Sequence, residues 1–357
     1  MKIVKIPNIE QKIRKIETLS PSMYTSILGG CAYQFVLKKA ISHSGIAATL
    51  PPNMNAIIGT ITHRLFEKRV KGEITNVDEF KKKWKQMCKE QENIIRNKYP
   101  SLLNYNVADY DKMFKAINIA MNMVPENKVQ NHSHITPIKT TECDVCISGL
   151  LKGSIDLIRK NGDKYELVDY KTGNCHDEEG NIKQAYIDQL NLYSIMFERQ
   201  YGAQVSKLTI IDNEGNNIDI PFEAKSSEEI LDEVRQTIDR INKSINSRQY
   251  HNLACISEKN CLWCNCRHVC KPFLQSSLNT NENIFIGHIE DVLGNDTILL
   301  RLTNGTIIRI IKMQVLYIDD WNELTGRKFI FINLSKRPTE CNAYARQANT
   351  VIFECEE

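Results

Sequence analysis

Two acidic residues and a lysine flank a predicted tight turn. Asp156 precedes the Asn161-Gly162 pair, a strong signal for a β-hairpin, and Asp169 and Lys171 follow it. Paired carboxylates bind hard divalent cations such as Mg²⁺ or Mn²⁺, and a neighbouring lysine stabilises negative charge on a phosphoryl oxygen. These residue types suit hydrolysis of a phosphodiester. Spacing alone leaves an alternative open, in which the carboxylates are exposed strand residues and the lysine forms a surface ion pair.

The length of the turn decides which of these side chains share a face. If Asn161-Gly162 is a two-residue loop, residue 160 pairs with residue 163, and Asp156 stands opposite Leu167. Side chains alternate along a strand, so residues 167, 169 and 171 project on the same side as Asp156. Asp156 is then the diagonal neighbour of Asp169, roughly 7–8 Å away between backbones. A change of one residue in the loop would place Asp156 on the other face.

The residues around this hairpin predict strands and helices that must position it. Alternating or β-branched runs predict strands at residues 143–147, 153–158, 165–171, 207–212 and 217–221. Helical spacing of apolar residues, with capping residues before it, predicts helices that start at Ser20-Pro21-Ser22 and recur over residues 56–70, 76–125, 183–200 and 226–247. We interpret the basic stretch from Lys81 to Lys85 as a solvated helix face rather than as a DNA-contact patch.

Twelve cysteines form a second signal, because four of them fall between residues 261 and 270. We expect a cytoplasmic protein without a secretory signal or membrane span, and in a reducing compartment clustered thiols indicate metal rather than disulfides. Cys261, Cys264 and Cys270 would surround one metal centre and need a fourth ligand, for which Cys31 is the candidate. A zinc site completed by Cys266 or His268 is the alternative. Cys143 and Cys146 lie on a predicted strand and would point to opposite faces.

Four ordered motifs together resemble a known family. They are Gly59-Thr60-Ile61-Thr62-His63, then Gly153-Ser154-Ile155-Asp156, then Val168-Asp169-Tyr170-Lys171-Thr172-Gly173, and finally Gln189-Leu190-Asn191-Leu192-Tyr193. Their order, identities and distances resemble the RecB-like branch of the PD-(D/E)XK nucleases. The resemblance implies an α/β fold, with a restriction-endonuclease-like core in which helices flank a central mixed β-sheet.

The resemblance also implies a role for each matching residue. His63, Asp156 and Asp169 would bind the metal ion, with the Tyr170 carbonyl as a possible fourth ligand and Glu142 as a further acidic ligand. Lys171 would be the catalytic lysine. Gln189 and Tyr193 are four residues apart on one helix face and would border the site and contact the substrate. Taken alone, His63 would be interpreted as an ordinary helix histidine, and ordinary core packing is the alternative for Tyr193.

The arrangement of cysteines along the chain, with one before the motifs and three after them, resembles that of the iron–sulfur subgroup of this branch. That subgroup includes helicase-linked exonucleases of break repair and exonucleases of CRISPR adaptation. The resemblance implies a [4Fe–4S] cluster held by Cys31, Cys261, Cys264 and Cys270, which joins the N-terminal helix to the end of the nuclease domain. It covers about residues 20–275.

The chain divides into three parts on this interpretation. Residues 1–19 form a basic, loosely ordered arm. Residues 20–280 form the nuclease domain, with a helical insertion at about 64–135. Residues 281–357 contain short β-branched runs at 284–289, 297–302, 306–311, 328–333 and 350–354, which predict a small all-β domain of the OB or SH3 barrel kind. From residue 281 onward, eight basic against eleven acidic side chains give a net charge of −3, which leaves +6 for residues 1–280.

The sequence therefore predicts a metal-dependent deoxyribonuclease that acts on single-stranded ends or flaps in DNA repair, recombination or defence. DNA would be held by the more basic N-terminal part. The acidic C-terminal part would contact a helicase or another protein. No G-x-x-x-x-G-K-[ST] motor motif occurs. The alternative is a non-catalytic, nuclease-like scaffold that binds DNA or docks a helicase.

Overall fold

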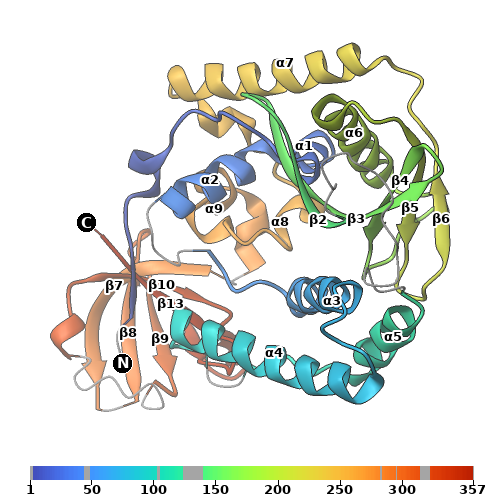
Figure 1. Cartoon of the computed structure of the whole chain (residues 1–357). Helices are drawn as coiled ribbons and strands as arrows, with labels where there is room; N and C mark the ends of the chain where they lie inside the picture. Colours follow the sequence, from blue (N-terminus) through green and yellow to red (C-terminus); the bar gives the residue numbers. More distant parts are fainter. Residues whose placement is uncertain are drawn as a thin grey trace.

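Two β-sheets and the helices around them make up the molecule (Figure 1). The computed structural model describes residues 3–43, 49–102, 105–123, 140–281, 284–294, 296–313 and 322–356. The five-stranded sheet carries the predicted site, and the eight-stranded sheet is built mainly from the C-terminal residues. None of the described helices combines the length and apolar character that a membrane span requires.

The five-stranded sheet confirms the expected mixed α/β core. Its strands lie in the order β2 (Thr141–Ile147), β3 (Leu151–Asn161), β4 (Lys164–Tyr170), β5 (Val205–Ile211) and β6 (Asn217–Ile220). Neighbouring strands are antiparallel except β4 and β5, which are parallel. A parallel pair needs a crossover connection, and α6 (Gln184–Tyr201) supplies it. Cys143 is buried and Cys146 exposed on β2, as their spacing predicts.

The hairpin between β3 and β4 differs from the predicted one by one residue. Asn161 pairs with Lys164, so the turn is Gly162-Asp163 rather than Asn161-Gly162. Gly162 adopts φ 64°, a conformation that glycine enters without steric cost and that suits the first central position of a type II′ turn. Ile158 therefore stands opposite Leu167. Continuing this register places Asp156 directly beside Asp169, closer than the predicted diagonal.

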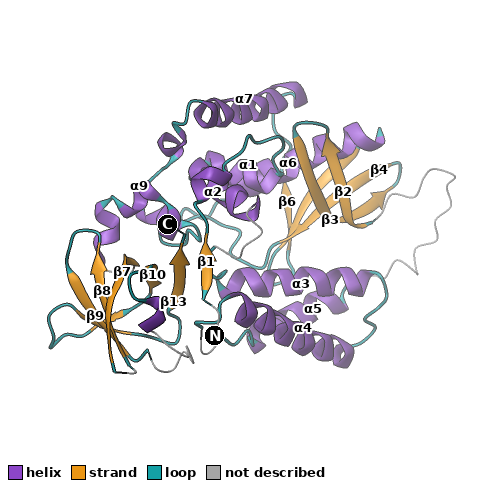
Figure 2. Cartoon of the chain, turned by 90° about the vertical axis from the view of Figure 1, so that its left-hand side faces the viewer, coloured by secondary structure: helices purple, strands orange, loops and turns teal. Residues whose placement is uncertain are grey.

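Helices pack on both sides of this sheet. In Figures 1 and 2, α1 (Pro21–Leu28), α6 and α7 (Ser227–Asn246) lie above the sheet, and three others lie below it: α3 (Met54–Val70), α4 (Val77–Lys98) and α5 (Tyr110–Met121). Side-chain oxygens of Ser20, Asn53, Asn76 and Asp109 each accept a backbone N–H at the start of a helix. The predicted insertion contains α4 and α5, and its residues 124–135 lie outside the described part of the chain.

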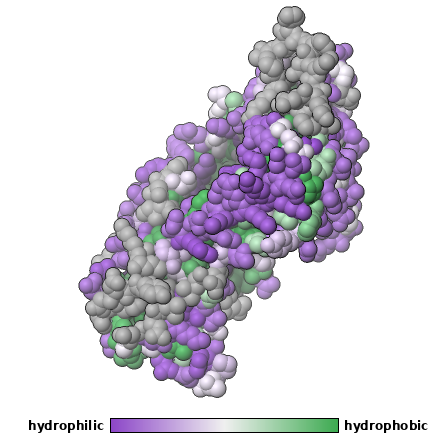
Figure 3. All heavy atoms as spheres, turned by 60° about the horizontal axis from the view of Figure 1, so that its bottom comes forward, coloured by the Kyte–Doolittle hydropathy of each residue, from purple (hydrophilic) through white to green (hydrophobic). Residues whose placement is uncertain are grey.

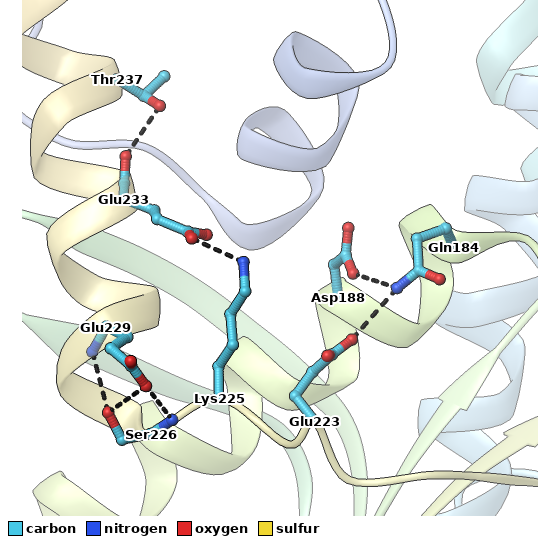
Figure 4. Close-up of polar contacts among 8 residues, drawn as sticks. All are labelled: Gln184, Asp188, Glu223, Lys225, Ser226, Glu229, Glu233 and Thr237. Atoms are coloured by element: carbon cyan, nitrogen blue, oxygen red, sulfur yellow. Dashed lines mark hydrogen bonds and ion pairs between the residues drawn. The ribbon is translucent and has the colours of Figure 1, made fainter.

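Polar contacts link the start of α6 to the segment that leads into α7, and link that segment to α7 itself (Figure 4). The Gln184 amide donates to Glu223 at 3.1 Å and to Asp188 at 2.7 Å. Lys225 pairs with Glu233 on α7 at 2.6 Å. Ser226 and Glu229 form a capping box at the first turn of α7. The first turns of α6, which precede Gln189, are therefore held at a defined position over the sheet.

The eight-stranded sheet runs in the order β1-β13-β10-β7-β8-β9-β12-β11. Five of its strands match the predicted runs: β7 (Ile284–Leu293), β8 (Thr297–Leu302), β9 (Ile307–Ile311), β10 (Lys328–Ile332) and β13 (Val351–Cys355). Two more, β11 (Ser335–Lys336) and β12 (Ala343–Ala345), are too short to produce a periodic pattern. One face of this sheet has its own core, and the other packs against the rest of the protein.

The eighth strand is β1 (Val4–Ile6), which pairs in parallel with β13 at the other end of the chain. The expectation of a loosely ordered arm over residues 1–19 is wrong for the described residues 3–19. Ile6, Ile9, Ile13, Ile16 and Leu19 are all buried. Their burial of apolar surface stabilises the segment against the core, an effect that the flanking basic residues obscure in the sequence.

Residues near the eight-stranded sheet contact the segments that surround the five-stranded sheet. The buried His268 ring stacks on Phe353 of β13, with centroids 5.1 Å apart. The Arg346 guanidinium donates to the Ser101 carbonyl at 2.6 Å, and the Ser101 hydroxyl accepts the Ile352 N–H at 3.2 Å. The C-terminal sheet therefore supports both the cysteine-rich segment and the end of α4.

We expect Ile6→Ala to lower the free energy of unfolding by about 2–5 kcal/mol, because it removes a buried side chain from the edge strand. The control is Lys5→Ala, which removes only a surface ion pair with Glu354 and should cost less than about 1 kcal/mol. Urea unfolding monitored by circular dichroism measures both values. Equal effects of the two substitutions would contradict a structural role for β1.

Candidate active site

Three carboxylates lie in a row across adjacent strands. Glu142 lies on β2 between residues that pair with Leu157 and Ile155, so its backbone faces Asp156 on β3. Asp156 in turn lies beside Asp169 at the end of β4. Glu142 has a φ of 46°, a strained conformation for a residue with a side chain. The strands thus bring three acidic groups to one end of the hairpin.

His63 comes to this row from α3, below the sheet. Its Nδ1 lies 3.3 Å from Asp156 Oδ2, and the same oxygen accepts the Tyr170 backbone N–H at 2.9 Å. The helix can approach because Gly59 has no side chain: a Cβ there would lie 3.0 Å from Thr172 Oγ1. The Tyr170 ring packs edge-on against Phe66 and His63. One turn of α3 is therefore held against the end of β4.

His63, Glu142 and Asp156 form a compact group of candidate metal ligands. Each offers one ligand atom, and these three atoms lie within 4.8 Å of one another. An imidazole nitrogen and two carboxylate oxygens are donors that a divalent cation accepts. Glu142 Oε2 also accepts the Ser154 hydroxyl at 3.3 Å, which orients its carboxylate. The residues present thus fit a divalent ion.

Asp169, Lys171 and Gln189 form a second, adjoining group. Lys171 Nζ lies 2.7 Å from Asp169 Oδ2 and donates to Gln189 Oε1 at 3.0 Å. Gln189 Nε2 donates to Asp169 Oδ1 at 3.1 Å. The Lys171 ammonium also lies 4.5 Å from the centre of the Tyr186 ring. Among the described residues, the Lys171 ammonium is the one partner of the buried Asp169 Oδ2.

Burial and like charge set the protonation of these groups. Burial raises the pKa of Asp169, Lys171 lowers it and the Asp156 charge raises it, and the net result is about 6. Burial alone would lower the pKa of Lys171, but the Asp169 carboxylate outweighs it and raises that pKa. Lys171 therefore keeps its positive charge at neutral pH.

The same balance acts on the metal-ligand group. Burial raises the pKa of Glu142, and the charges of Asp156 and Glu67 raise it further. Burial would lower the pKa of His63, but the hydrogen bond to Asp156 and the charges of Asp156 and Asp169 raise it overall. The Asp156 charge contributes to the raised pKa values of Glu142 and Asp169, and a bound cation would relieve this repulsion.

Tyr193 lies on the next turn of α6, beyond Gln189. It is buried, and burial raises its pKa, as do the charges of Asp169 and Asp156, while hydrogen bonds with Gln189 and the Ser154 backbone oppose the rise. The ring lies against Gly153 of β3, where a Cβ would be 2.8 Å from Tyr193 Cε1. The structure therefore brings the residues predicted for the catalytic and divalent-metal site together at one end of the hairpin, whereas the four predicted cluster cysteines lie elsewhere.

The family of the chain follows from its sequence profile over residues 18–271, which matches the PD-(D/E)XK nuclease superfamily. That range covers well over half of the chain and contains every residue of the site. The chain belongs to the PD-(D/E)XK nuclease superfamily. Its structure is similar to the crystal structure of "Putative exonuclease" from Eubacterium rectale, with 14% sequence identity, a TM-score of 0.38, and coverage of 72% of this chain and 88% of that chain. No curated protein sequence matches it.

A cavity of about 530 Å³ adjoins the site of this nuclease on the α3 side. Lys171, Tyr170 and Thr172 form one wall, and Phe66 on α3 and Phe114 on α5 belong to the others. Residues from the end of β4 and from the helices below the sheet therefore line one cavity.

The cysteine-rich segment of this superfamily member lies apart from the row of carboxylates. Cys261, Cys264, Cys266 and Cys270 are buried, and Cys31 is half-buried at the turn before α2 (Ala32–His43). The Cys31 sulfur accepts the Cys255 backbone N–H at 3.3 Å. The short helix α8 (Glu258–Cys261) ends at Cys261, and α9 (Lys271–Leu274) follows directly after Cys270.

Sequence reasoning missed three contributors to the site. Tyr186 lies under Lys171, Ser154 donates to Glu142, and Thr172 contacts the α3 backbone. Tyr186 precedes Gln189 by three residues, so helical spacing could have found it. The other two act through strand register and through helix–strand contact, which no local pattern encodes.

We expect Gly153→Ala to displace the Tyr193 ring and to lower the free energy of unfolding by about 1–3 kcal/mol, because the added methyl overlaps that ring. Gly173→Ala is the control, since a Cβ at Gly173 meets nothing within 4 Å. Denaturant unfolding of both variants tests the contact. A Gly153→Ala protein as stable as the control would show that Tyr193 is not packed there.

Proposed function

We propose that this nuclease is a divalent-metal-dependent deoxyribonuclease that hydrolyses phosphodiesters. The observation that carries the proposal is the junction of two groups: the trio His63, Glu142 and Asp156 on one side, and the Asp169–Lys171 ion pair on the other. Asp156 links them, because it contacts His63 and lies beside Asp169. A metal-ligand set next to a half-buried, positively charged lysine suits attack on a phosphate.

His63, Glu142 and Asp156 would hold Mg²⁺ or Mn²⁺, with Asp169 and the Tyr170 carbonyl as further ligands. Carboxylates suit either ion, and the imidazole favours Mn²⁺ over Mg²⁺. When bound, the ion would supply positive charge that polarises the phosphoryl group. The position of Asp169 beside Asp156 supports its place in this set.

Lys171 would donate hydrogen bonds to a non-bridging phosphate oxygen. Its raised pKa keeps it charged, and Asp169 and Gln189 hold its ammonium in place, so no reorganisation is needed as negative charge develops. Gln189 and Tyr193 border the same space and would position the scissile phosphate.

Single-stranded ends or flaps are the substrates that the RecB-like resemblance favours. End-labelled single-stranded, duplex and flap DNA, incubated with and without Mn²⁺, would establish the preferred substrate, the polarity, and whether cleavage starts at an end. Metal-dependent loss of label from single strands and flaps is the expected result. Binding without cleavage under every metal condition would instead favour a non-catalytic scaffold.

We expect Lys171→Ala to reduce the cleavage rate by about 10²–10³-fold or more, because it removes a preorganised cation from the reacting phosphate. Lys160→Ala is the matched control: this lysine is exposed on the same hairpin and should leave the rate unchanged. Circular dichroism and metal content check that both variants fold alike. Full activity in Lys171→Ala would remove the catalytic assignment.

We further propose that Cys31, Cys261, Cys264 and Cys270 hold a [4Fe–4S] cluster. Burial raises the pKa of Cys270 to about 12, and the charges of Cys264, Cys31 and Cys261 add to it, so these four thiols lie within electrostatic reach of one another. A single zinc ion needs four ligand atoms packed closely. In the part of the chain that the structure describes, the cysteines form no such compact group, which favours the larger cluster.

We expect Cys261→Ser to lose iron and sulfide and to become less stable, because one cluster thiolate is removed. The exposed Cys146→Ser should keep both, since Cys146 points away from this segment. Iron, sulfide and zinc analysis of protein purified without oxygen gives the measurement. Stoichiometric zinc and no sulfide in the wild-type protein would replace the cluster with a zinc site.

A further inference from the structure

A basic stripe runs along α4, outside the row of carboxylates. Lys81, Lys85, Lys89 and Arg96 recur at intervals of four and seven residues, which places them on one helix face. Lys85, Lys89 and Arg96 are exposed, and none of the four forms an ion pair within the described residues. In Figure 3 the face that carries α4 is predominantly hydrophilic. The stripe extends about 22 Å along the helix axis, since each residue rises 1.5 Å.

Two exposed aromatic rings line up beside this stripe. Tyr110 and Phe114 are four residues apart on α5 and therefore share a face. Tyr110 is 60% exposed and Phe114 is 51% exposed, values that are unusual for aromatic side chains next to a buried core. The Lys81 ammonium lies 5.6 Å from the centre of the Phe114 ring, so the basic stripe and the aromatic pair adjoin.

Two cavities join these features to the site. The first, which Lys171 and Thr172 line, also has Lys112, Phe114 and Lys115 in its wall. The second cavity has a volume of about 340 Å³ and lies between α4 and the start of α5. Residues of α4 that line it are Trp84, Lys85, Cys88, Lys89, Glu92, Asn93 and Arg96, and the residues at the start of α5 are Ala108, Asp109 and Tyr110. Asp109 belongs to both cavities, so they are neighbours along one surface.

The acidic residues along this surface are mostly engaged by the backbone. Asp109 caps α5 by accepting the Lys112 N–H at 3.0 Å. Glu92 accepts the Val107 N–H at 2.8 Å, and Asp212 accepts the N–H groups of Glu214 and Asn216 at 2.8 and 2.9 Å. Of the acidic residues that line the two cavities, Asp111 alone has no such bond among the described residues. Most of these carboxylates are therefore held by backbone N–H groups, whereas the α4 cations are available to contact an external anion.

We propose that the surface between α4 and α5 binds a single-stranded nucleic acid and leads it to the site. Bases would stack on Tyr110 and Phe114, and phosphates would contact Lys81, Lys85, Lys89 and Arg96. Exposed aromatic rings beside a basic stripe are the usual means of holding a single strand without reading its sequence. The proposal rests on the proposed function and adds the substrate path to it.

The first experiment removes the rings and keeps the chemistry. Tyr110→Ala combined with Phe114→Ala should weaken binding of fluorescent oligothymidylate about tenfold or more in EDTA, because each stacked base contributes substantially. Phe222→Ala is the control, since Phe222 is 49% exposed and lies at a different cavity. With Mn²⁺, Tyr110→Ala alone should raise KM for the oligonucleotide and leave hydrolysis of bis(p-nitrophenyl) phosphate unchanged, because Tyr110 lines the second cavity and not the one that Lys171 lines.

The second experiment reverses charge on the stripe. Lys85→Glu combined with Lys89→Glu should weaken binding and lower the slope of log Kd against log salt concentration by about 1.4, since about 0.7 counterions are released per phosphate contact on a single strand. Arg240→Glu combined with Lys243→Glu changes the net charge equally on the exposed side of α7. Oligouridylate and duplex DNA, tested in parallel, distinguish the sugar and the strandedness of the ligand.

The outcomes separate the two proposals. The proposed substrate path would be wrong if the α4 and α5 variants kept the wild-type affinity and salt slope. It would also be wrong if the α7 control weakened binding equally. Either outcome would leave the nuclease proposal intact. Stronger binding of duplex than of either single strand would also overturn the path. A wild-type protein that hydrolyses neither the oligonucleotide nor bis(p-nitrophenyl) phosphate would instead contradict the proposed function.

Discussion

The site depends on holding carboxylates closer together than their charges favour. Glu142, Asp156 and Asp169 occupy neighbouring positions on three adjacent strands, and each raises or is raised by another's negative charge. Lys171 and His63 offset part of this repulsion. The remaining repulsion would be relieved by a cation bound among the three carboxylates. The fold therefore holds these groups in an arrangement that could accept a metal ion.

Rigid packing on both sides of the sheet makes that arrangement possible. Below the sheet, Gly59 lets α3 approach the end of β4, and above it Gly153 admits the Tyr193 ring. Gln189 has one contact with Asp169 and one with Lys171, and it lies on a helix whose first residue, Gln184, donates a hydrogen bond to Glu223 in the segment before α7. Preorganised donors of this kind lower the barrier to reaction, because the protein need not rearrange as charge develops.

The sequence predicted the parts of the site that follow local rules. The hairpin, its carboxylates and the helix carrying Gln189 and Tyr193 all follow from turn chemistry and periodicity. The predicted turn was misplaced, but it shifted the residue opposite Asp156 by two positions, from Leu167 to Asp169, and a shift by an even number keeps Asp156 on the same face of the sheet. The pairing of β1 with β13 joins the two ends of the chain through three residues, so no periodic signal exists for it. Glu142 was placed through family resemblance, and its strained backbone appears only in the folded chain.

The basic stripe of α4 shows where a sequence pattern is ambiguous for a physical reason. Lysines at helical spacing describe a solvated face and a phosphate-binding face equally well, because both need exposed charge on an amphipathic helix. The residues that lie next to the lysines in the folded protein distinguish the two kinds of face. Here α5 places Tyr110 and Phe114 beside the stripe, and the adjoining cavity ends at Lys171. Exposed rings cost hydrophobic free energy in water, and a stacked base would recover it, so their position next to unpaired cations favours a ligand that carries both rings and phosphates.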